Sequence, residues 1–215
     1  MTVLPCRGLL FDSDGVLVDS DAVVLRSWTR WAHRWDMDPD AVTGVVHGRR
    51  SADTVAVLLD PADRARALAD IDRFEVEDAA GVTALPGAGQ LLTSLPAGSW
   101  AVVTSGRREL ARARLVAAGL PVPAVLVCAE DVPRGKPDPA GYLAAATGLG
   151  VPVADCLVLE YSPAGIAAGA AAGARVVGVG ERAVATDVAV VVRDLTGLRW
   201  DGAALHLPAD GLLRG

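Results

Sequence analysis

The chain has 215 residues, 52% of them hydrophobic, and a formal net charge of −6. This length suits one α/β domain, or one domain that carries a small insert, and the acidic balance excludes the basic surface that nucleic-acid binding needs. No apolar stretch approaches the length of a membrane span, and the N-terminus lacks the features of a secretion signal. The sequence therefore predicts a cytoplasmic protein that binds neither nucleic acid nor a membrane.

The first predicted element is a short strand followed by two aspartates. The apolar residues 9–11 stop at Asp12-Ser13-Asp14-Gly15, which is the pattern of a buried strand that ends in a loop. In open α/β sheets, ligands bind beyond the carboxyl ends of the strands, where both aspartates fall. Two carboxylates this close oppose each other's ionisation, so a bound cation or a shared proton is expected.

The next sixty residues carry helical patterns. Four large apolar residues recur on one helical face, and this spacing is typical of packing: Val24, Trp28, Trp31 and Trp35. Further helices are predicted over 39–46, 52–59 and 62–78. Because no strand signal occurs between about residues 20 and 84, this segment is predicted to be an all-helical insert.

Strands and helices alternate again after Pro86-Gly87. Strands are predicted over 100–103, 125–128, 156–159, 175–179 and 188–192, helices over 108–118, 140–147 and 163–172, and an edge strand within 200–207. This alternation indicates a parallel sheet with right-handed crossovers. The three cysteines have no metal-binding spacing, and two lie in or beside apolar runs, so they are predicted to be buried free thiols.

Polar residues directly follow three of the predicted strands, and one more lies in the loop after a fourth strand. They are Asp12 and Asp14, Thr104 and Ser105, Lys136 (the only lysine of the chain) and Glu160. Carboxylate oxygens suit Mg²⁺, which also engages substrate phosphate, and a helix that begins after Thr104-Ser105-Gly106 favours an anion. Unit like charges ~4 Å apart cost roughly 4 kcal/mol at an effective dielectric of about 20, so a phosphate needs cations beside these acids.

Each of these residues also has a purely structural interpretation. Aspartates cap turns, Ser and Thr are frequent helix N-caps, and a lone lysine or glutamate can be a surface residue. The combination of all four groups at strand ends favours a phosphate site.

Four segments in this order resemble the motifs of haloacid dehalogenase-superfamily phosphatases: FDSDGVLVDS, VVTSG, GKPDP and LVLEYSPAGIAAGAAAG. The resemblance spans about residues 8–180. Three segments are similar to those of the subgroup that acts on sugar, polyol and glycerol phosphates: HGRRSADT, SWAVVTSGRRELARARLVAAGLP and GKPDPAGYLAAA. The resemblance implies a Rossmann-like α/β core, residues 1–18 and 82–215, with a helical cap, residues 19–81. A monomer is expected.

The resemblance also implies the catalytic roles. Asp12 would be the nucleophile that forms an aspartyl-phosphate, and Asp14 would protonate the leaving alcohol and then deprotonate water. Thr104 and Lys136 would hold the transferring phosphoryl group. Mg²⁺ would be bound by Asp12, by the backbone carbonyl of Asp14 and by Glu160, the acid that follows the fourth strand. The predicted substrate-binding residues are Ser105 and Gly106, together with His47, Gly48, Arg49 and Arg50 of the cap.

One position departs from the family pattern. Members usually carry Glu-Asp or Asp-Asp where this chain has Glu160-Tyr161, and the missing aspartate is normally a metal ligand. Even changes behind the ligands lower metal affinity about 10–100-fold. Three interpretations stay open: Glu160 binds the metal directly, the site works only at high Mg²⁺, or the protein is a weakened or non-catalytic member.

The predicted function is that of a Mg²⁺-dependent phosphatase acting on a small sugar, polyol or glycerol phosphate. One alternative is a phosphomutase of the β-phosphoglucomutase type, which shares the core. The other is a catalytically weak or non-catalytic phosphate-binding protein, which Tyr161 alone supports.

Overall fold

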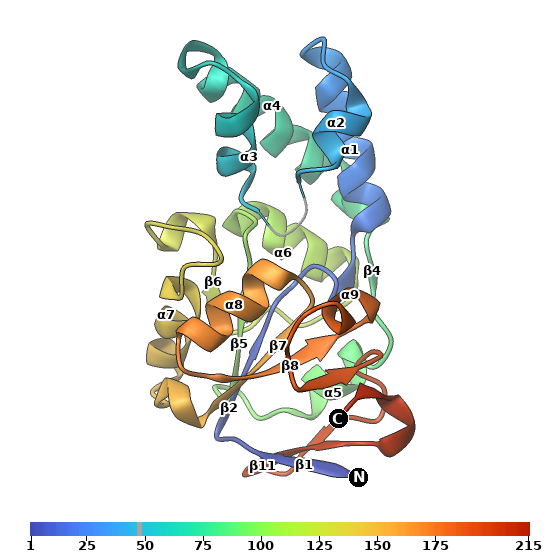
Figure 1. Cartoon of the computed structure of the whole chain (residues 1–215), viewed down its shortest axis with the longest axis vertical. Helices are drawn as coiled ribbons and strands as arrows, with labels where there is room; N and C mark the ends of the chain where they lie inside the picture. The colour runs from blue at the N-terminus through green and yellow to red at the C-terminus, as the bar shows by residue number, and fades with distance from the viewer. Residues whose placement is uncertain (47–48) are drawn as a thin grey trace.

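The structure is a computed structural model and describes residues 1–46 and 49–215. Its centre is a seven-stranded sheet in the order β12-β9-β8-β7-β2-β5-β6 (Figure 1). All neighbouring strands are parallel except β12, which pairs antiparallel with β9. The strands are β2 (Gly8–Phe11), β5 (Trp100–Val103), β6 (Val125–Val127), β7 (Cys156–Glu160), β8 (Arg175–Val179), β9 (Val190–Val192) and β12 (Leu212–Arg214).

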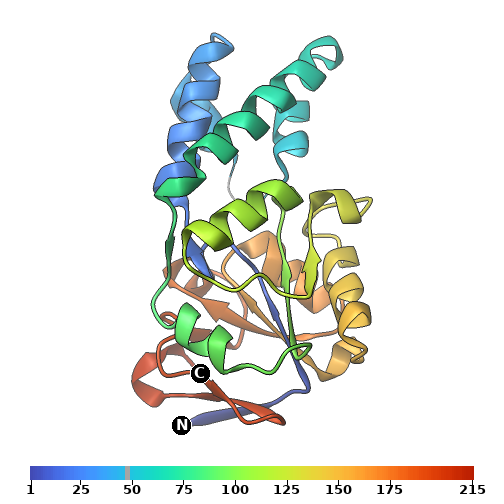
Figure 2. The same ribbon diagram turned by 180° about the vertical axis from the view of Figure 1, so that it is seen from behind.

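Helices cover both faces of this sheet, which explains why its strands read as continuous apolar runs. In β2, Leu9 and Phe11 pack into one core while Leu10 packs into the other. The first core receives α5 (Ala88–Ser94) and α6 (Arg108–Ala117), and the second receives α7 (Ala140–Leu149) and α8 (Pro163–Ala171). Figure 1 shows α8 in front of the sheet, and Figure 2 shows α5 and α6 on the opposite side.

The helical segment stands beyond one end of the sheet (Figure 1). It contains α1 (Asp21–Arg34), α2 (Pro39–Thr43), α3 (Ser51–Leu58) and α4 (Pro61–Asp78). These helices share a core of their own, in which Trp28 and Trp31 pack with Phe74. The Trp31 indole also donates a hydrogen bond to the Ala67 carbonyl (2.8 Å). The tryptophan pattern therefore marks packing, as predicted.

Two short strands connect this segment to the sheet. β3 (Val18–Asp19) and β4 (Thr83–Ala84) pair antiparallel, so the chain enters and leaves the helical segment side by side. The ribbon lies where the boundary between core and cap is predicted, and that division stays a prediction. Between these strands the described residues form only helices and connecting turns, and no helix of the described part is long and apolar enough to cross a bilayer.

The prediction of one edge strand within 200–207 was wrong, because this segment forms two strands that belong to a separate sheet. The segment forms β10 (Arg199–Trp200) and β11 (Ala204–Leu207), and β11 pairs with β1 (Thr2–Pro5) in a separate antiparallel sheet. The Asp201 carboxylate accepts hydrogen bonds from the backbone N–H groups of Ala203 and Ala204 and so forms the turn that divides the segment. The remaining short helices are α9 (Glu181–Val184) and the 3₁₀ helices at Ala79–Gly81, Ala129–Asp131, Val153–Asp155 and Ala209–Gly211.

All three cysteines are buried free thiols, as predicted. Burial raises the pKa of Cys128 to about 12 and that of Cys156 to about 11, and it also raises the pKa of Cys6. Since the thiolate is the reactive form, we expect no thiol of the native protein to react quickly with an aromatic disulfide reagent at neutral pH, and all three to react in denaturant. Rapid labelling of the native protein would contradict this expectation.

Candidate active site

The site begins where β2 ends. Asp12 is buried, and its backbone N–H donates to the Leu159 carbonyl of β7 (3.0 Å), which fixes its place at the edge of the sheet. Three residues on, Gly15 has a φ of +80°, and a Cβ there would lie 2.4 Å from the Tyr161 ring. This loop therefore requires glycine both for its conformation and for the close approach of Tyr161.

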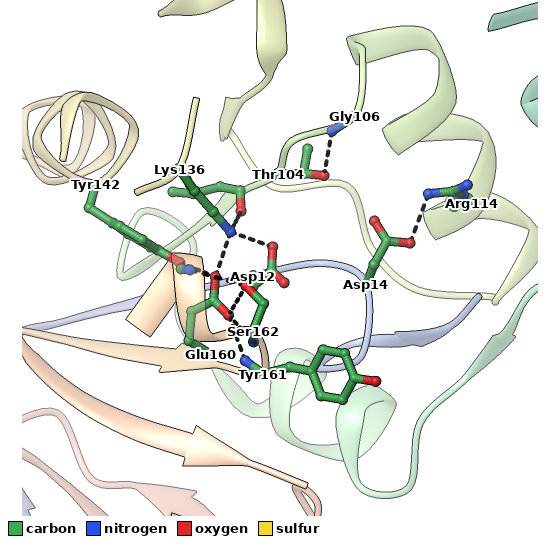
Figure 3. A network of polar contacts seen from close by, with 12 residues as sticks. Asp12, Asp14, Thr104, Gly106, Arg114, Lys136, Tyr142, Glu160, Tyr161 and Ser162 are labelled. Carbon is green, nitrogen blue, oxygen red and sulfur yellow. Dashed lines mark hydrogen bonds and ion pairs between the residues drawn. The ribbon is translucent and has the colours of Figure 1, made fainter. Parts of the chain in front are cut away.

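Lys136 joins the loop after β6 to the ends of β2 and β7. Its Nζ donates to Asp12 Oδ1 (2.6 Å), to Glu160 Oε1 (2.7 Å) and to the Val103 carbonyl (3.2 Å) (Figure 3). The Lys136 side chain is 7% exposed. Three polar groups that the sequence predicted at strand ends thus lie in direct contact.

Glu160 is fully buried and uses both of its carboxylate oxygens. Oε1 accepts from Lys136 and from the Tyr142 hydroxyl (3.0 Å), and Oε2 accepts from the Tyr161 N–H (2.6 Å) and from the Ser162 N–H (2.7 Å) and hydroxyl (3.3 Å). Gly165 makes room for this carboxylate, because a Cβ there would lie 1.4 Å from Oε1. Glu160 thus accepts five hydrogen bonds, and the four from groups other than Lys136 hold it beside that lysine.

The charges of these three residues are strongly coupled. Burial raises the pKa of Asp12, the Glu160 charge raises it further, and Lys136 opposes both. Burial by itself lowers the pKa of Lys136, but the charges and hydrogen bonds of Asp12 and Glu160 outweigh it, so the net shift is upward. Lys136 is therefore an ammonium ion between two buried acids.

Asp14 faces away from this group (Figure 3). Its Oδ1 accepts hydrogen bonds from the Ser20 hydroxyl (2.5 Å) and from Arg114 Nη1 (2.8 Å). Arg114 comes from α6, is 4% exposed, and also donates to Glu75 Oε1 of α4 (3.2 Å). Sequence reasoning missed Arg114, Glu75 and Tyr142, because each lies in a helical pattern that any charged or core residue would fit.

The turn before α6 is shaped by Thr104, whose Oγ1 accepts from the Gly106 N–H (3.0 Å). Thr104 is buried at the end of β5. Ser105 and Gly106 line the same cavity as Asp12 and Lys136, whereas Thr104 lines a neighbouring pocket that it shares with Ser105 and Lys136. The structure therefore brings Ser105 and Gly106 to the space above Asp12, where an anion would approach the helix.

The cavity lies between the sheet edge and the helices α1, α3 and α4. Its floor contains Asp12, Asp14 and Lys136, and its far wall contains Trp28, Ser51 and Glu75. Of the four predicted cap residues, Arg49 lines this cavity. His47 and Gly48 lie outside the described residues.

Arg50 is not part of the cavity wall. Its guanidinium pairs with both oxygens of Asp53 (2.8 and 3.0 Å) and reaches the Val132 and Pro133 carbonyls at 3.5 Å. It packs against Gly135, beside Lys136. Arg50 therefore connects α3 to the loop that carries the lysine.

The described residues contain no group of three or more His, Cys, Asp or Glu side chains arranged to hold a metal ion. Tyr161 supplies no ligand in this arrangement, because its hydroxyl donates to Asp21 (3.3 Å) and its ring lies beneath Arg182. Mg²⁺ is usually bound by one or two carboxylates, water and substrate phosphate. The Asp12 carboxylate fits such a site together with the Asp14 backbone carbonyl, because the Asp14 side chain faces Ser20 and Arg114. Glu160 would have to give up hydrogen bonds to become a ligand.

Two curated relatives cover most of this chain. Hexitol phosphatase A of Escherichia coli (strain K12) is 43% identical over 81% of this chain and 83% of its own length. Glycerol-1-phosphate phosphohydrolase 2 of Saccharomyces cerevisiae is 32% identical over 82% of this chain and 75% of its own. Both are named as enzymes that remove phosphate from a polyol.

A solved structure and a family model agree with these relatives. A haloacid dehalogenase family hydrolase from Deinococcus radiodurans R1, solved with bound phosphate and sodium, matches with a TM-score of 0.61 and 32% identity, over 82% of this chain and 81% of that one. The model of haloacid dehalogenase-like hydrolases matches residues 6–173, which is well over half of the chain. The chain is therefore a phosphatase of the haloacid dehalogenase-like hydrolase family.

Proposed function

We propose that the protein hydrolyses the phosphate monoester of a small polyol or sugar through an aspartyl-phosphate on Asp12. One observation carries this proposal: the Lys136 ammonium contacts Asp12 at 2.6 Å on the floor of the cavity. A carboxylate nucleophile normally repels a phosphate dianion. Lys136 and the loop before α6 reduce that repulsion at the place where the phosphoryl group must bind.

In the first step an Asp12 oxygen attacks phosphorus, the new O–P bond forms, and the bond from phosphorus to the ester oxygen breaks. Asp14 gives its proton to the departing alcohol. In the second step water attacks the phosphorus of the aspartyl-phosphate, Asp14 takes the proton from that water, and Asp12 leaves as a carboxylate. Lys136 faces the phosphoryl oxygens throughout and offsets their charge.

A magnesium ion would be held by the Asp12 carboxylate and the Asp14 backbone carbonyl, and would supply further positive charge to the phosphoryl group. Both aspartates line the cavity floor, and the Asp14 side chain, which bonds Ser20 and Arg114, stays available for proton transfer. Glu160 acts instead on Lys136, which it holds beside Asp12. As a third ligand Glu160 stays a prediction.

The substrate class is proposed from the relatives and from the cavity wall. The two curated relatives are named for hexitol and glycerol phosphates. Ser51 and Glu75 present a hydroxyl and a carboxylate opposite the cavity floor. A phosphomutase would have to hold a second phosphate there, next to the Glu75 carboxylate, whereas a polyol chain brings no second charge.

Phosphate release from a panel of hexitol, glycerol and hexose phosphates, measured across a Mg²⁺ titration, tests the proposal. We expect turnover of at least one polyol phosphate that requires Mg²⁺. Interconversion of phosphate isomers without release of phosphate would favour the mutase instead. Absence of both reactions at every Mg²⁺ concentration would refute the proposal.

Replacing Tyr161 with aspartate is expected to lower the Mg²⁺ concentration needed for half-maximal turnover about 10–100-fold, because a carboxylate is added beside Asp12 and Asp14. The Tyr161→Phe variant is the matched control. It loses only the hydrogen bond to Asp21, so its Mg²⁺ dependence should equal that of the native chain. Identical Mg²⁺ curves for Tyr161→Asp and the native chain would show that this position is not next to the metal.

A further inference from the structure

Glu75, Arg114 and Ser51 form a buried polar cluster on the cavity wall. They come from α4, from α6 and from the first residue of α3. Arg114 Nη2 donates to Glu75 Oε1 (3.2 Å), and the Ser51 hydroxyl donates to Glu75 Oε2 (3.1 Å). All three line the cavity that contains Asp12 and Lys136. We propose that this cluster binds the hydroxyl groups of the substrate's polyol chain, an inference that rests on the proposed phosphatase function.

Stability alone does not explain why this charged cluster is buried. Glu75 is 5% exposed and Arg114 is 4% exposed, and Glu75 shares α4 with the buried apolar residues Ile71 and Phe74. A buried ion pair often contributes less to stability than apolar side chains of the same volume. In the described part of the chain, Arg114 Nε is also buried without a hydrogen-bond partner. A ligand group in the cavity would explain why these charges are retained.

The chemistry of the cluster matches a chain of hydroxyl groups. A carboxylate accepts hydrogen bonds from hydroxyls, a guanidinium donates to hydroxyl oxygens, and a serine can do both. Trp28 and Leu110 line the same cavity and offer apolar contact to the carbons between those hydroxyls. An alkyl chain would offer these polar groups no further hydrogen bond, and a second phosphate would bring another negative charge next to the Glu75 carboxylate.

The cluster also lies on the side of the reaction centre where the leaving alcohol would be. Arg114 contacts Glu75 with one terminal nitrogen and Asp14 with the other, so it spans from the cluster to the proposed acid. In a polyol phosphate, the first free hydroxyl is on the carbon next to the one that carries the ester oxygen, to which Asp14 would give its proton. Hydroxyls next to the leaving oxygen would therefore reach Arg114 and Glu75.

The test compares two esters in three variants. In Glu75→Gln, kcat/KM for a hexitol phosphate should fall about 10–100-fold, because a hydrogen bond to a charged group is lost. The fall for butyl phosphate should be several-fold smaller, because only the effect that reaches Asp14 through Arg114 is common to both esters. Ser51→Ala should show the same selectivity with a smaller fall. The control is Glu77→Gln, which removes the same charge two residues further along α4. Glu77 is exposed and pairs with Arg30, so this variant should leave kcat/KM for both esters unchanged.

An equal fall for both esters in Glu75→Gln would overturn the subsite, since it would mark a structural role. If Glu75→Gln does not fold, Ser51→Ala decides, and unchanged selectivity there overturns the proposal. If the native chain hydrolyses no ester, the phosphatase proposal fails on its own, and calorimetry then decides the subsite. Tighter binding of hexitol phosphate than of butyl phosphate, reduced in Glu75→Gln, would still support the subsite, and equal binding would overturn it.

Discussion

Replacing Lys136 with methionine is expected to abolish phosphate release and to lower the free energy of unfolding by about 3–5 kcal/mol. Methionine keeps most of the apolar stem but removes the ammonium ion that contacts Asp12 at 2.6 Å and Glu160 at 2.7 Å. Both carboxylates are buried, so the variant would leave two acids beside each other without a counter-charge. Denaturant unfolding followed by circular dichroism measures the change.

Arg134→Met is the control for that experiment. Arg134 lies on the same loop and pairs with Asp138, but its side chain is 78% exposed. Exposed ion pairs contribute about 0–1 kcal/mol, so this variant should unfold almost as the native chain does. A Lys136→Met variant as stable as Arg134→Met would show that the buried acids are neutral or solvated in solution.

Replacing Asp12 with asparagine is expected to reduce turnover at least about 10⁴-fold, because an amide cannot attack phosphorus and form the covalent intermediate. The fold should be retained, since the asparagine carbonyl can still accept the hydrogen bond from Lys136. Because burial and the Glu160 charge both oppose ionisation of Asp12, the thermal midpoint should stay unchanged or rise.

Asp19→Asn serves as the comparison, because Asp19 is an exposed aspartate of the β3/β4 ribbon. It should keep native turnover, and phosphate release with a hexitol phosphate measures both variants. Turnover in Asp12→Asn within about tenfold of the native rate would refute an aspartyl-phosphate mechanism on this residue.

The sequence alone determined the α/β class and the edge of the sheet at which the polar groups gather. Parallel strands buried on both faces produce apolar runs such as residues 9–11 and 100–103, and such runs are visible without a structure. Because the carboxyl ends of these strands share one edge, Asp12, Lys136 and Glu160 could be placed near one another before any distance was known.

Only the tertiary structure decided which charged residues of the helices belong to the cavity. Arg114 is one of many arginines, and its partners Glu75 and Asp14 are 39 and 100 positions away in the chain. Likewise, Arg49 lines the cavity while its neighbour Arg50 pairs with Asp53. Helical periodicity reports which residues share a face of one helix, but not which distant segment covers that face, because packing between segments depends on contacts that are remote in sequence.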